Sequence, residues 1–239
     1  MSALVACGLR AGYGGAEVLH GIDLHVDDGE VIVILGANGA GKTTTLLALA
    51  GVIPSSGSVE MLGRVAHGPL HERAAAGLAF LPEDRGIVRG LTVENNLRLA
   101  GVTPADAYSL SPELRSLCRR KGAALSGGEQ QMLALTSALV RAPKLLMGDE
   151  LSFGLAPIIV SRMLGLIRAV ADTGTAVVLV EQYAKQALAV ADRAYVLRRG
   201  QVELEGRAQD LLGDIASIEG IYQGATTNIN GARKARTNK

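Results

Sequence analysis

Short, continuous apolar runs recur along the chain and predict buried strands. Four of them cover residues 31–35, 77–81, 145–147 and 176–180. Each is rich in Leu, Val or Ile and lacks polar alternation, which is typical of strands covered on both faces of a parallel sheet. Helical patterns over residues 43–50, 126–140 and 157–173 supply the crossover connections. The pattern predicts an α/β fold built on a parallel sheet.

Polar residues follow each of these runs directly. They are residues 36–39, 82–83, 148–150 and 181–182. In open α/β sheets, ligands bind beyond the carboxyl ends of the strands. We therefore expect the four segments to meet at one edge of the sheet and to form a single site.

Three other segments depart from this rhythm. Residues 4–26, with turn signals at 12–15 and 27–29, predict short antiparallel strands that flank the first parallel strand. Residues 100–125, with a predicted helix over 112–120, predict a small helical insert. Residues 224–239 contain Arg233, Lys234, Arg236 and Lys239 and no acidic residue. They predict a basic, disordered tail, with contact to anionic lipid or nucleic acid as the alternative.

Composition narrows the class of protein. The 239 residues are 48% apolar and 20% charged, with 24 Lys and Arg against 23 Asp and Glu. This balance is typical of a globular protein, and it does not suggest a nucleic-acid partner held by a broad electropositive field. The two cysteines, Cys7 and Cys118, exclude a disulfide framework and favour a reducing compartment. The apolar runs are far shorter than a membrane span, so a partner would have to cross any membrane involved.

A glycine-rich loop follows the first predicted strand and opens a helix. Residues 36–43 match the phosphate-loop pattern G-x-x-x-x-G-K-[ST], for which a chance glycine turn is the alternative. The backbone amides and the helix N-terminus would bind an anion. Lys42 would reach the β and γ phosphates of a nucleotide, and the Thr43 hydroxyl would hold Mg²⁺. The predicted nucleotide-binding residues are Gly36, Asn38, Gly39, Ala40, Gly41, Lys42, Thr43 and Thr44.

Two carboxylates close the third apolar run. Asp149 ends the run and Glu150 follows it. An Asp-Glu pair at a strand end is commonly a solvated turn. Beside a phosphate loop, however, the pair suggests a carboxylate that holds Mg²⁺ and a second one that orients or deprotonates water.

A second helix start carries glycines. Residues 125–131 read Leu-Ser-Gly-Gly-Glu-Gln-Gln, with Ser126 as N-cap and Glu129 placed to complete a capping box. A well-capped helix is the simple interpretation. Gly127 and Gly128, however, would expose further amides at the positive end of the helix and form a second anion site that has no lysine of its own.

With the phosphate loop, this second glycine site and the Asp149-Glu150 pair in that order, the chain resembles the ATP-binding subunits of ABC transporters over nearly its whole length. The resemblance implies a P-loop NTPase (RecA-like) core with an antiparallel β subdomain and a small helical subdomain. It also implies that two subunits face each other head to tail, with ATP between the phosphate loop of one and Ser126–Gly128 of the other. Tyr13 would stack on adenine; a turn or core tyrosine is the alternative.

Finer features resemble the LivF-like subunits of branched-chain amino-acid importers. These are residues 81–86, 91–97, 154–157 and 180–182. Glu83 lies where most ABC ATPases have glutamine, and the resemblance implies that it joins Thr43 and Asp149 at the metal. Gln182 lies where most relatives have a histidine that contacts the γ phosphate. Glutamine donates a neutral hydrogen bond, so its stabilisation of the transferring phosphoryl group would be weaker and independent of histidine titration.

Three departures from the group concern the site and its partner surface. Gly148 replaces a bulky apolar residue, and Leu151 stands where proline is usual; both would loosen the loop that positions Glu150. The insert after residue 99 is also shorter than is usual for the group, which would alter the surface that meets a permease.

The resemblance implies one ABC ATPase domain over residues 1–223, with a shortened helical insert at about 88–130 and a tail over 224–239. It implies ATP and Mg²⁺ as ligands, with Glu150, Lys42 and Gln182 as catalytic residues. The partners would be a second ATPase subunit, membrane permease subunits and a solute-binding protein, with the chain at the cytoplasmic face of the membrane. Alternatives are a partner subunit with degenerate hydrolysis, a urea or amide importer, and, least favoured, an ATPase acting on nucleic acid or ribosomes.

Overall fold

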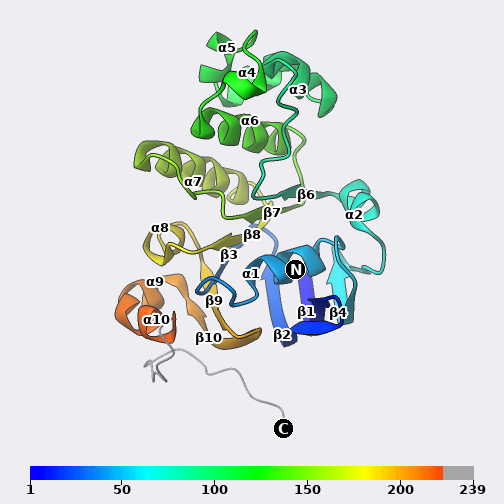
Figure 1. Cartoon of the computed structure of the whole chain (residues 1–239), viewed down its shortest axis with the longest axis vertical. Helices are drawn as coiled ribbons and strands as arrows, with labels where there is room; N and C mark the ends of the chain where they lie inside the picture. The colour runs from blue at the N-terminus through cyan, green and yellow to red at the C-terminus, as the bar shows by residue number, and fades with distance from the viewer. Residues whose placement is uncertain (223–239) are drawn as a thin grey trace.

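The structure is a computed structural model that describes residues 1–222. The predicted basic tail at 224–239 therefore lies outside the described residues. Within residues 1–222, the chain forms two sheets, with helices on both sides of the larger one and a group of helices at one end (Figure 1).

The larger sheet contains the four predicted strands and two more. Its order is β10-β9-β3-β8-β7-β6, in which the four pairings from β9 to β6 are parallel and β10 is antiparallel to β9. The prediction of a parallel core sheet is confirmed, whereas β9 and β10 were not predicted. The strands are β3 (Val31–Leu35), β6 (Leu78–Leu81), β7 (Leu145–Asp149), β8 (Ala176–Glu181), β9 (Arg193–Arg198) and β10 (Gln201–Arg207).

The smaller sheet is antiparallel and is more extensive than predicted. It has the order β2-β1-β4-β5, with β1 (Ser2–Tyr13), β2 (Ala16–Asp27), β4 (Ser55–Met61) and β5 (Arg64–Val65). The predicted antiparallel arrangement is confirmed. The predicted length and placement were wrong, because β1 and β2 are 12 residues each and lie with β4 and β5 in a separate sheet. Bulges interrupt the register of their pairing. Each bulge breaks the alternation of apolar and polar positions, so the sequence hides the length of the strands.

Successive residues of the core strands point into two different hydrophobic layers. Ile32 and Ile34 of β3 join the layer shared with α1 (Lys42–Leu49) and the antiparallel sheet. Val31 and Val33 join the opposite layer, against α6, α7 and the C-terminal helices. Because both faces are buried, the strands can be continuously apolar. The helices of the second layer are α6 (Gly127–Leu139), α7 (Pro157–Ala171), α8 (Ala184–Leu188), α9 (Ala208–Leu212) and α10 (Ile215–Tyr222).

The predicted helical insert forms a small group of helices with its own core at the top of Figure 1. It comprises α3 (Val93–Leu99), α4 (Pro104–Leu110), α5 (Glu113–Ser116) and the 3-10 turn η1 (Gly122–Ala124), packed on α6; α2 (Leu70–Ala76) lies beside β6. The predicted helix over 112–120 was wrong beyond Ser116. The following residues turn back and bond to the start of α3, where the Val93 N–H donates to the Arg120 carbonyl and the Glu94 N–H to that of Cys118. These tertiary bonds replace the helical ones.

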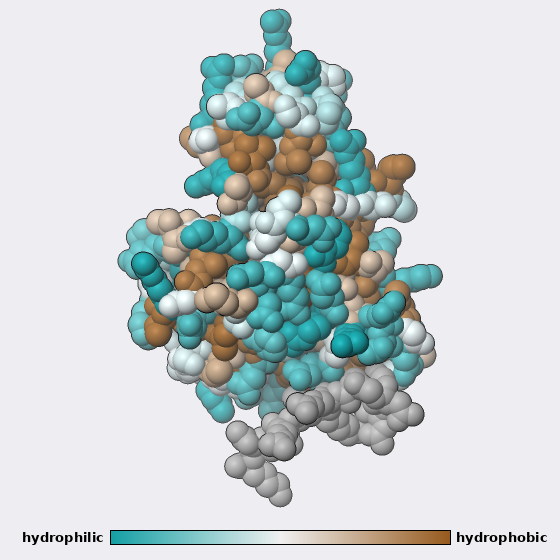
Figure 2. Space-filling view, turned by 180° about the vertical axis from the view of Figure 1, so that it is seen from behind, coloured by the Kyte–Doolittle hydropathy of each residue, from teal (hydrophilic) through white to brown (hydrophobic). Residues whose placement is uncertain are grey.

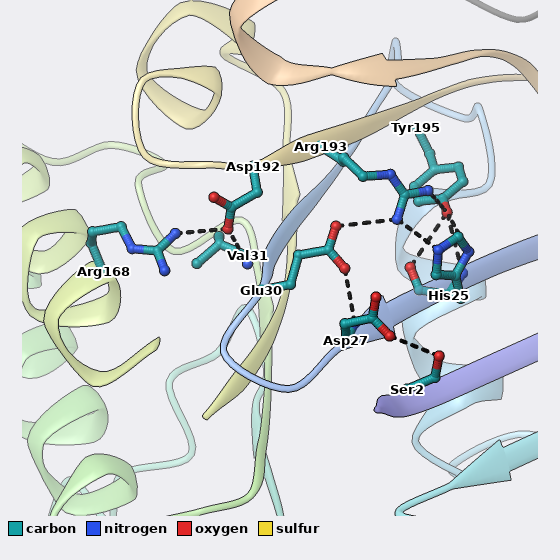
Figure 3. Close-up of polar contacts among 9 residues, drawn as sticks. All are labelled: Ser2, His25, Asp27, Glu30, Val31, Arg168, Asp192, Arg193 and Tyr195. Atoms are coloured by element: carbon teal, nitrogen blue, oxygen red, sulfur yellow. Dashed lines mark hydrogen bonds and ion pairs between the residues drawn. The ribbon is translucent and has the colours of Figure 1, made fainter. Parts of the chain in front are cut away.

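A polar network joins the two sheets at the edge where the parallel strands begin (Figure 3). Arg193 on β9 forms an ion pair with Glu30 at 3.1 Å and contacts His25 on β2 at 3.0 Å. The Tyr195 hydroxyl accepts a hydrogen bond from the His25 backbone N–H at 3.2 Å. Arg168 on α7 pairs with Asp192, which in turn accepts a hydrogen bond from the Val31 N–H. Side chains therefore join the two sheets at the edge opposite the one where the site is predicted.

At that opposite edge, Gly200 connects three segments. Its N–H donates to the Ala40 carbonyl in the phosphate loop, and its carbonyl accepts from the His20 N–H on β2. Gly200 has a positive φ of 73°, and an added Cβ would overlap the Val18 carbonyl oxygen. Only glycine fits both the conformation and the space.

We predict that Gly200→Ala lowers the free energy of unfolding by about 2–4 kcal/mol, because left-handed backbone strain and overlap with backbone act together. Nucleotide affinity should also fall, since the phosphate loop loses its support. Denaturant unfolding and titration with a fluorescent nucleotide measure both effects. The control is Gly165→Ala on the exposed face of α7, where nothing lies within 4 Å of the new Cβ. Stability there should rise by about 0.5–1 kcal/mol, and a similar result at Gly200 would contradict the prediction.

Candidate nucleotide site

The phosphate loop lies between β3 and α1, as predicted. Gly39 and Gly41 have φ values of 76° and 104°, a left-handed conformation that glycine adopts without strain. An added Cβ on Gly36 would lie 2.6 Å from the Leu197 carbonyl oxygen and 2.9 Å from the Ala40 Cβ. The glycines therefore allow the loop to turn sharply against β9 before α1 begins at Lys42.

The four predicted polar segments meet in one pocket of about 400 Å³. Because the carboxyl ends of the parallel strands share one edge, residues from four separate segments are brought together. The lining comes from the phosphate loop and α1, the turn after β6, the segment after β7 and the segment after β8: Asn38, Gly39, Gly41, Lys42, Thr43, Thr44, Glu83, Glu150, Phe153 and Gln182. Gly36 and Ala40 lie within the loop but do not line the pocket.

Lys42 crosses the pocket on a buried side chain. It is 4% exposed, and its Nζ lies 3.3 Å from the Ala37 carbonyl oxygen and 3.5 Å from Oε1 of Glu150. A buried ammonium group requires nearby oxygens, and an anionic phosphate would supply more of them. The position is the one that a phosphate-binding lysine needs.

Asp149 and Thr43 form a second polar pair at the pocket. The Thr43 hydroxyl donates a hydrogen bond of 3.2 Å to Oδ1 of Asp149. Burial raises the pKa of Asp149 to about 6; the bond from Thr43 opposes this shift, and the charges of Glu150 and Glu83 add to it. Hydroxyl and carboxylate oxygens are the ligands that Mg²⁺ prefers, usually together with water and substrate phosphate. Thr43, Asp149 and Glu83 therefore fit a magnesium ion.

Glu150 has an unusual backbone conformation. Its φ is 45°, in the left-handed region that a non-glycine residue rarely adopts. The Glu150 N–H donates to the Val180 carbonyl of β8 at 2.9 Å, and its carboxylate is 16% exposed beside Lys42. Such strain persists only where the surrounding structure imposes it, and it is common at functional sites. The conformation points a carboxylate into the pocket from the end of a rigid strand.

The second glycine site lies apart from this pocket in the same chain. The capping box at α6 is confirmed: the Glu129 N–H donates to the Ser126 hydroxyl at 3.3 Å, and the Ser126 N–H to the Glu129 carboxylate at 2.7 Å. Ser126 is exposed, and Ser126, Gly127 and Gly128 are absent from the described lining of the phosphate pocket. An added Cβ on Gly128 would lie 3.2 Å from the Ile159 side chain of α7. The helix start is therefore accessible to another molecule.

Tyr13 also lies outside the pocket lining. It ends β1 and is 49% exposed, so its ring is not a core residue. The described structure therefore does not favour the core alternative, and stacking on adenine stays a prediction.

Two residues of the site were missed from the sequence. Phe153 lines the pocket with a 52% exposed ring, and an apolar residue in the loop after Glu150 is its only sequence signal. Arg85 donates to the side-chain oxygens of Gln130 at 2.7 Å and Gln131 at 3.1 Å, which links the turn that carries Glu83 to α6. Because these partners lie on a distant helix, no local pattern marks Arg85.

The fold and the pocket define a P-loop nucleotide-binding protein. The ABC transporter family pattern matches residues 19–152, more than half of the chain, and the chain belongs to this family of ABC ATPases. It is 41% identical to the branched-chain amino-acid transport ATP-binding protein BraG of Pseudomonas aeruginosa, over 84% of this chain and 91% of that one. It is 37% identical to a probable branched-chain amino-acid transport ATP-binding protein LivF of Archaeoglobus fulgidus, over 85% and 92%.

Solved structures support the same fold. An ATP-binding subunit of an ABC transporter aligns with a TM-score of 0.76 at 26% identity, covering 94% of this chain and 95% of that one. An ATP-binding cassette in its ADP conformation aligns with a TM-score of 0.82 at 24% identity, over 94% and 99%. Across residues 1–222, none of the helices has the length and apolar character needed to cross a membrane.

A buried carboxyl group lies directly behind the pocket. Glu181 ends β8, is 3% exposed, and accepts hydrogen bonds from the Ser152 N–H at 3.1 Å and the Ser152 hydroxyl at 2.6 Å. Burial raises the pKa of Glu181 to about 7; the Ser152 bonds oppose the shift, and the charges of Glu150 and Asp149 add to it. Glu181 therefore carries a proton at a pH where an exposed glutamate does not.

We predict that this group makes the free energy of unfolding fall as pH rises. The folded pKa of about 7 lies above the ordinary value of 4.5, so the stabilising contribution is complete below pH 4.5 and is lost as pH rises through 7. Glu181→Gln, which cannot ionise, should gain up to about 3 kcal/mol relative to the native chain between pH 4.5 and pH 8. Urea unfolding at both pH values measures this difference. An unchanged difference would show that the carboxyl group titrates normally.

Proposed function

We propose that the chain binds ATP with Mg²⁺ in the pocket and hydrolyses it to drive import of branched-chain amino acids, or a related small polar solute, through a separate permease. One observation carries the proposal: Lys42, Thr43 and Glu150 line one pocket at the carboxyl edge of the sheet, and Asp149 is bonded to Thr43 there. Phosphate binding, metal binding and water activation each need one of these groups.

The phosphate side of the site follows from charge and backbone geometry. Backbone amides of the loop and the N-terminus of α1 would surround the β and γ phosphates, with Lys42 donating to their oxygens. Thr43, Asp149 and Glu83 would hold Mg²⁺, which neutralises charge on the phosphates when bound. The carboxyl of Asp149 would lose its proton on meeting the cation, because a positive charge favours the ionised form.

Glu150 is the proposed general base. Its carboxylate would orient the attacking water and accept its proton. Gln182 lines the same pocket and would donate a neutral hydrogen bond to the γ phosphate. This donor does not titrate near neutral pH, in contrast to a histidine.

We propose that a second ABC subunit completes the site, as a homodimer or a heterodimer. Ser126 is exposed in the protomer and does not line its own phosphate pocket, so Ser126–Gly128 are free to cap the nucleotide of a facing subunit. Amides at a capped helix start are suited to an anion. Tyr13 would contact the adenine ring from the exposed end of β1.

The proposed permease contact is an apolar groove at the base of the helical subdomain. The groove has a volume of about 410 Å³ between β6, α2, α3 and α6. Leu99 and Val88 on its lining are 66% and 43% exposed. Figure 2 shows apolar side chains gathered below the helical subdomain on one face of the molecule. This contact would place the chain at the cytoplasmic face of a membrane, in a complex that includes a solute-binding protein.

The nature of the solute rests on the relatives' names. BraG and LivF are named for branched-chain amino-acid transport, whereas LptB of Escherichia coli, 31% identical over 94% of this chain, is named for lipopolysaccharide export. The ATPase itself does not contact the cargo, so a urea or amide importer is the second candidate. A partner subunit with degenerate hydrolysis is disfavoured, because the pocket contains Lys42, Thr43 and Glu150.

We predict that Glu150→Gln lowers the turnover of Mg²⁺-dependent ATP hydrolysis in the assembled transporter by about 10²–10⁴-fold, because the general base is lost. Nucleotide affinity should stay close to that of the native chain. Phosphate release measures turnover, and Glu60→Gln on β4 is the control outside the pocket. Native turnover in Glu150→Gln would refute the role of Glu150.

We predict that Ser126→Arg abolishes hydrolysis while nucleotide binding to the isolated chain is retained. The substitution adds bulk and charge at an exposed helix start, so it would block the facing subunit without filling the protomer's own pocket. Loss of the N-cap should cost about 1 kcal/mol of stability. Ser126→Ala, which loses the same cap without adding bulk or charge, controls for that loss and should retain more hydrolysis than Ser126→Arg. Unchanged ATPase activity in the Arg variant would contradict completion of the site by a partner.

A further inference from the structure

The chain crosses to the far face of the sheet immediately after Glu150. Asp149 faces the α1 layer, where it meets Thr43. Alternation along β7 directs position 148 into the opposite layer, beside Leu81 of β6 and Leu179 of β8, its neighbours in the sheet. Leu151 and Ser152 also reach this opposite layer, through the core and through Glu181. Glu150 therefore lies between a residue that faces one side of the sheet, Asp149, and two that face the other side, Leu151 and Ser152.

Leu151 occupies the space that a side chain at position 148 would need. An added Cβ on Gly148 would lie 2.7 Å from Cδ1 and 3.0 Å from Cγ of Leu151. Leu151 is 2% exposed and belongs to the hydrophobic core between the sheet and α6 and α7. Gly148 has no left-handed conformation to explain it. Its lack of a side chain is explained by the Leu151 side chain alone.

Ser152 is held from the neighbouring strand. Both of its donors, the N–H and the hydroxyl, bond to the Glu181 carboxyl group at 3.1 Å and 2.6 Å. Either the neutral or the ionised carboxyl group can accept both bonds. Ser152 and Glu181 are each less than a tenth exposed, so the pair is shielded from competing water.

These contacts bracket the strained residue. The Glu150 N–H is bonded to Val180 at 2.9 Å, and the next two side chains are fixed in the core and on Glu181. A left-handed φ of 45° costs free energy and relaxes unless its neighbours are held. The anchors leave the Glu150 carboxylate beside Lys42.

We propose that Leu151, seated against Gly148, and Glu181, through Ser152, are positioning residues that hold Glu150 in its catalytic orientation. The inference rests on the proposed function, since it assigns these residues to the same hydrolytic site. It also revises the sequence-based expectation that Gly148 and Leu151 each loosen the loop that positions Glu150. Together the two residues form a complementary pair that fixes this loop.

The first experiment is a mutant cycle on positions 148 and 151, measured as ATP turnover and KM in the assembled transporter. Leu151→Ala should lower kcat by about 10- to 100-fold through misplacement of Glu150, while KM stays within about twofold. Gly148→Ala should be at least as harmful, because its Cβ displaces Leu151. In the Leu151→Ala background, however, Gly148→Ala should be neutral or restorative, since it fills the vacated space. Additive losses in the double variant would overturn the pairing.

The second experiment separates anchoring from general packing. Glu181→Leu removes both acceptors and should lower kcat by about tenfold or more, whereas Glu181→Gln keeps an acceptor oxygen and should restore most of it. Ser111→Ala deletes a buried hydroxyl bonded to Thr136 in the helical subdomain, and Leu164→Ala truncates a core leucine of α7. These matched controls should lose stability and keep their kcat. Equal kcat values in Glu181→Leu and the controls would overturn the role of Glu181.

A third measurement does not depend on hydrolysis. Hydrogen exchange of the amides over residues 150–154 in the nucleotide-free chain should become faster in Leu151→Ala and Glu181→Leu and stay unchanged in Leu164→Ala. If the native chain shows no ATPase activity but exchange follows this pattern, the proposed function fails and the anchoring of the loop stands. If ATPase activity depends on Glu150 but Leu151→Ala and Glu181→Leu change neither the exchange rates nor kcat, the proposed function stands and the positioning proposal fails.

Discussion

One electrostatic constraint governs the pocket: a single buried ammonium group and two carboxylates line it, and a third carboxyl group lies just behind. Among the described residues that line the pocket, Lys42 is the only cation, while Glu83 and Glu150 share the lining and Asp149 lies behind Thr43. Burial is the main reason that the pKa of Asp149 is raised, and the charges of Glu150 and Glu83 add to the shift. Phosphates would satisfy Lys42, and a divalent cation would satisfy the acids. The site is thus arranged for an anion and a cation together, which is what Mg²⁺ and a nucleoside triphosphate provide.

The carboxyl groups of the pocket repel each other, so the fold must hold them in place, and it does so through several contacts. Gly200 ties the phosphate loop to β2, and the Arg193 network joins the same two sheets at the far edge. Parallel strands fix the relative positions of the carboxyl groups, because Asp149 and Glu181 end adjacent strands of one ladder. Glu150 follows the last residue of β7, and its strained backbone directs its side chain into the pocket.

Local chemistry explains what the sequence could predict. The four core strands and the phosphate loop carry their information in consecutive residues: continuous apolar runs, and glycines followed by lysine and threonine. The capping box at Ser126 is equally local. Strand ends of a parallel sheet must share an edge, so the meeting of these segments followed from topology alone.

What the sequence could not predict depends on contacts across the fold. Arg85 and Glu181 act through partners 46 and 29 residues away, and no local pattern marks such pairs. Bulges hid the length of β1 and β2, and backbone bonds to α3 ended α5 early. Leu151 is the clearest example. Considered alone in the sequence, it suggests a loosened loop. Its position against Gly148 in the structure indicates that the two departures from the family pattern compensate each other. A substitution that breaks a local rule is therefore best judged with the residue whose space it fills.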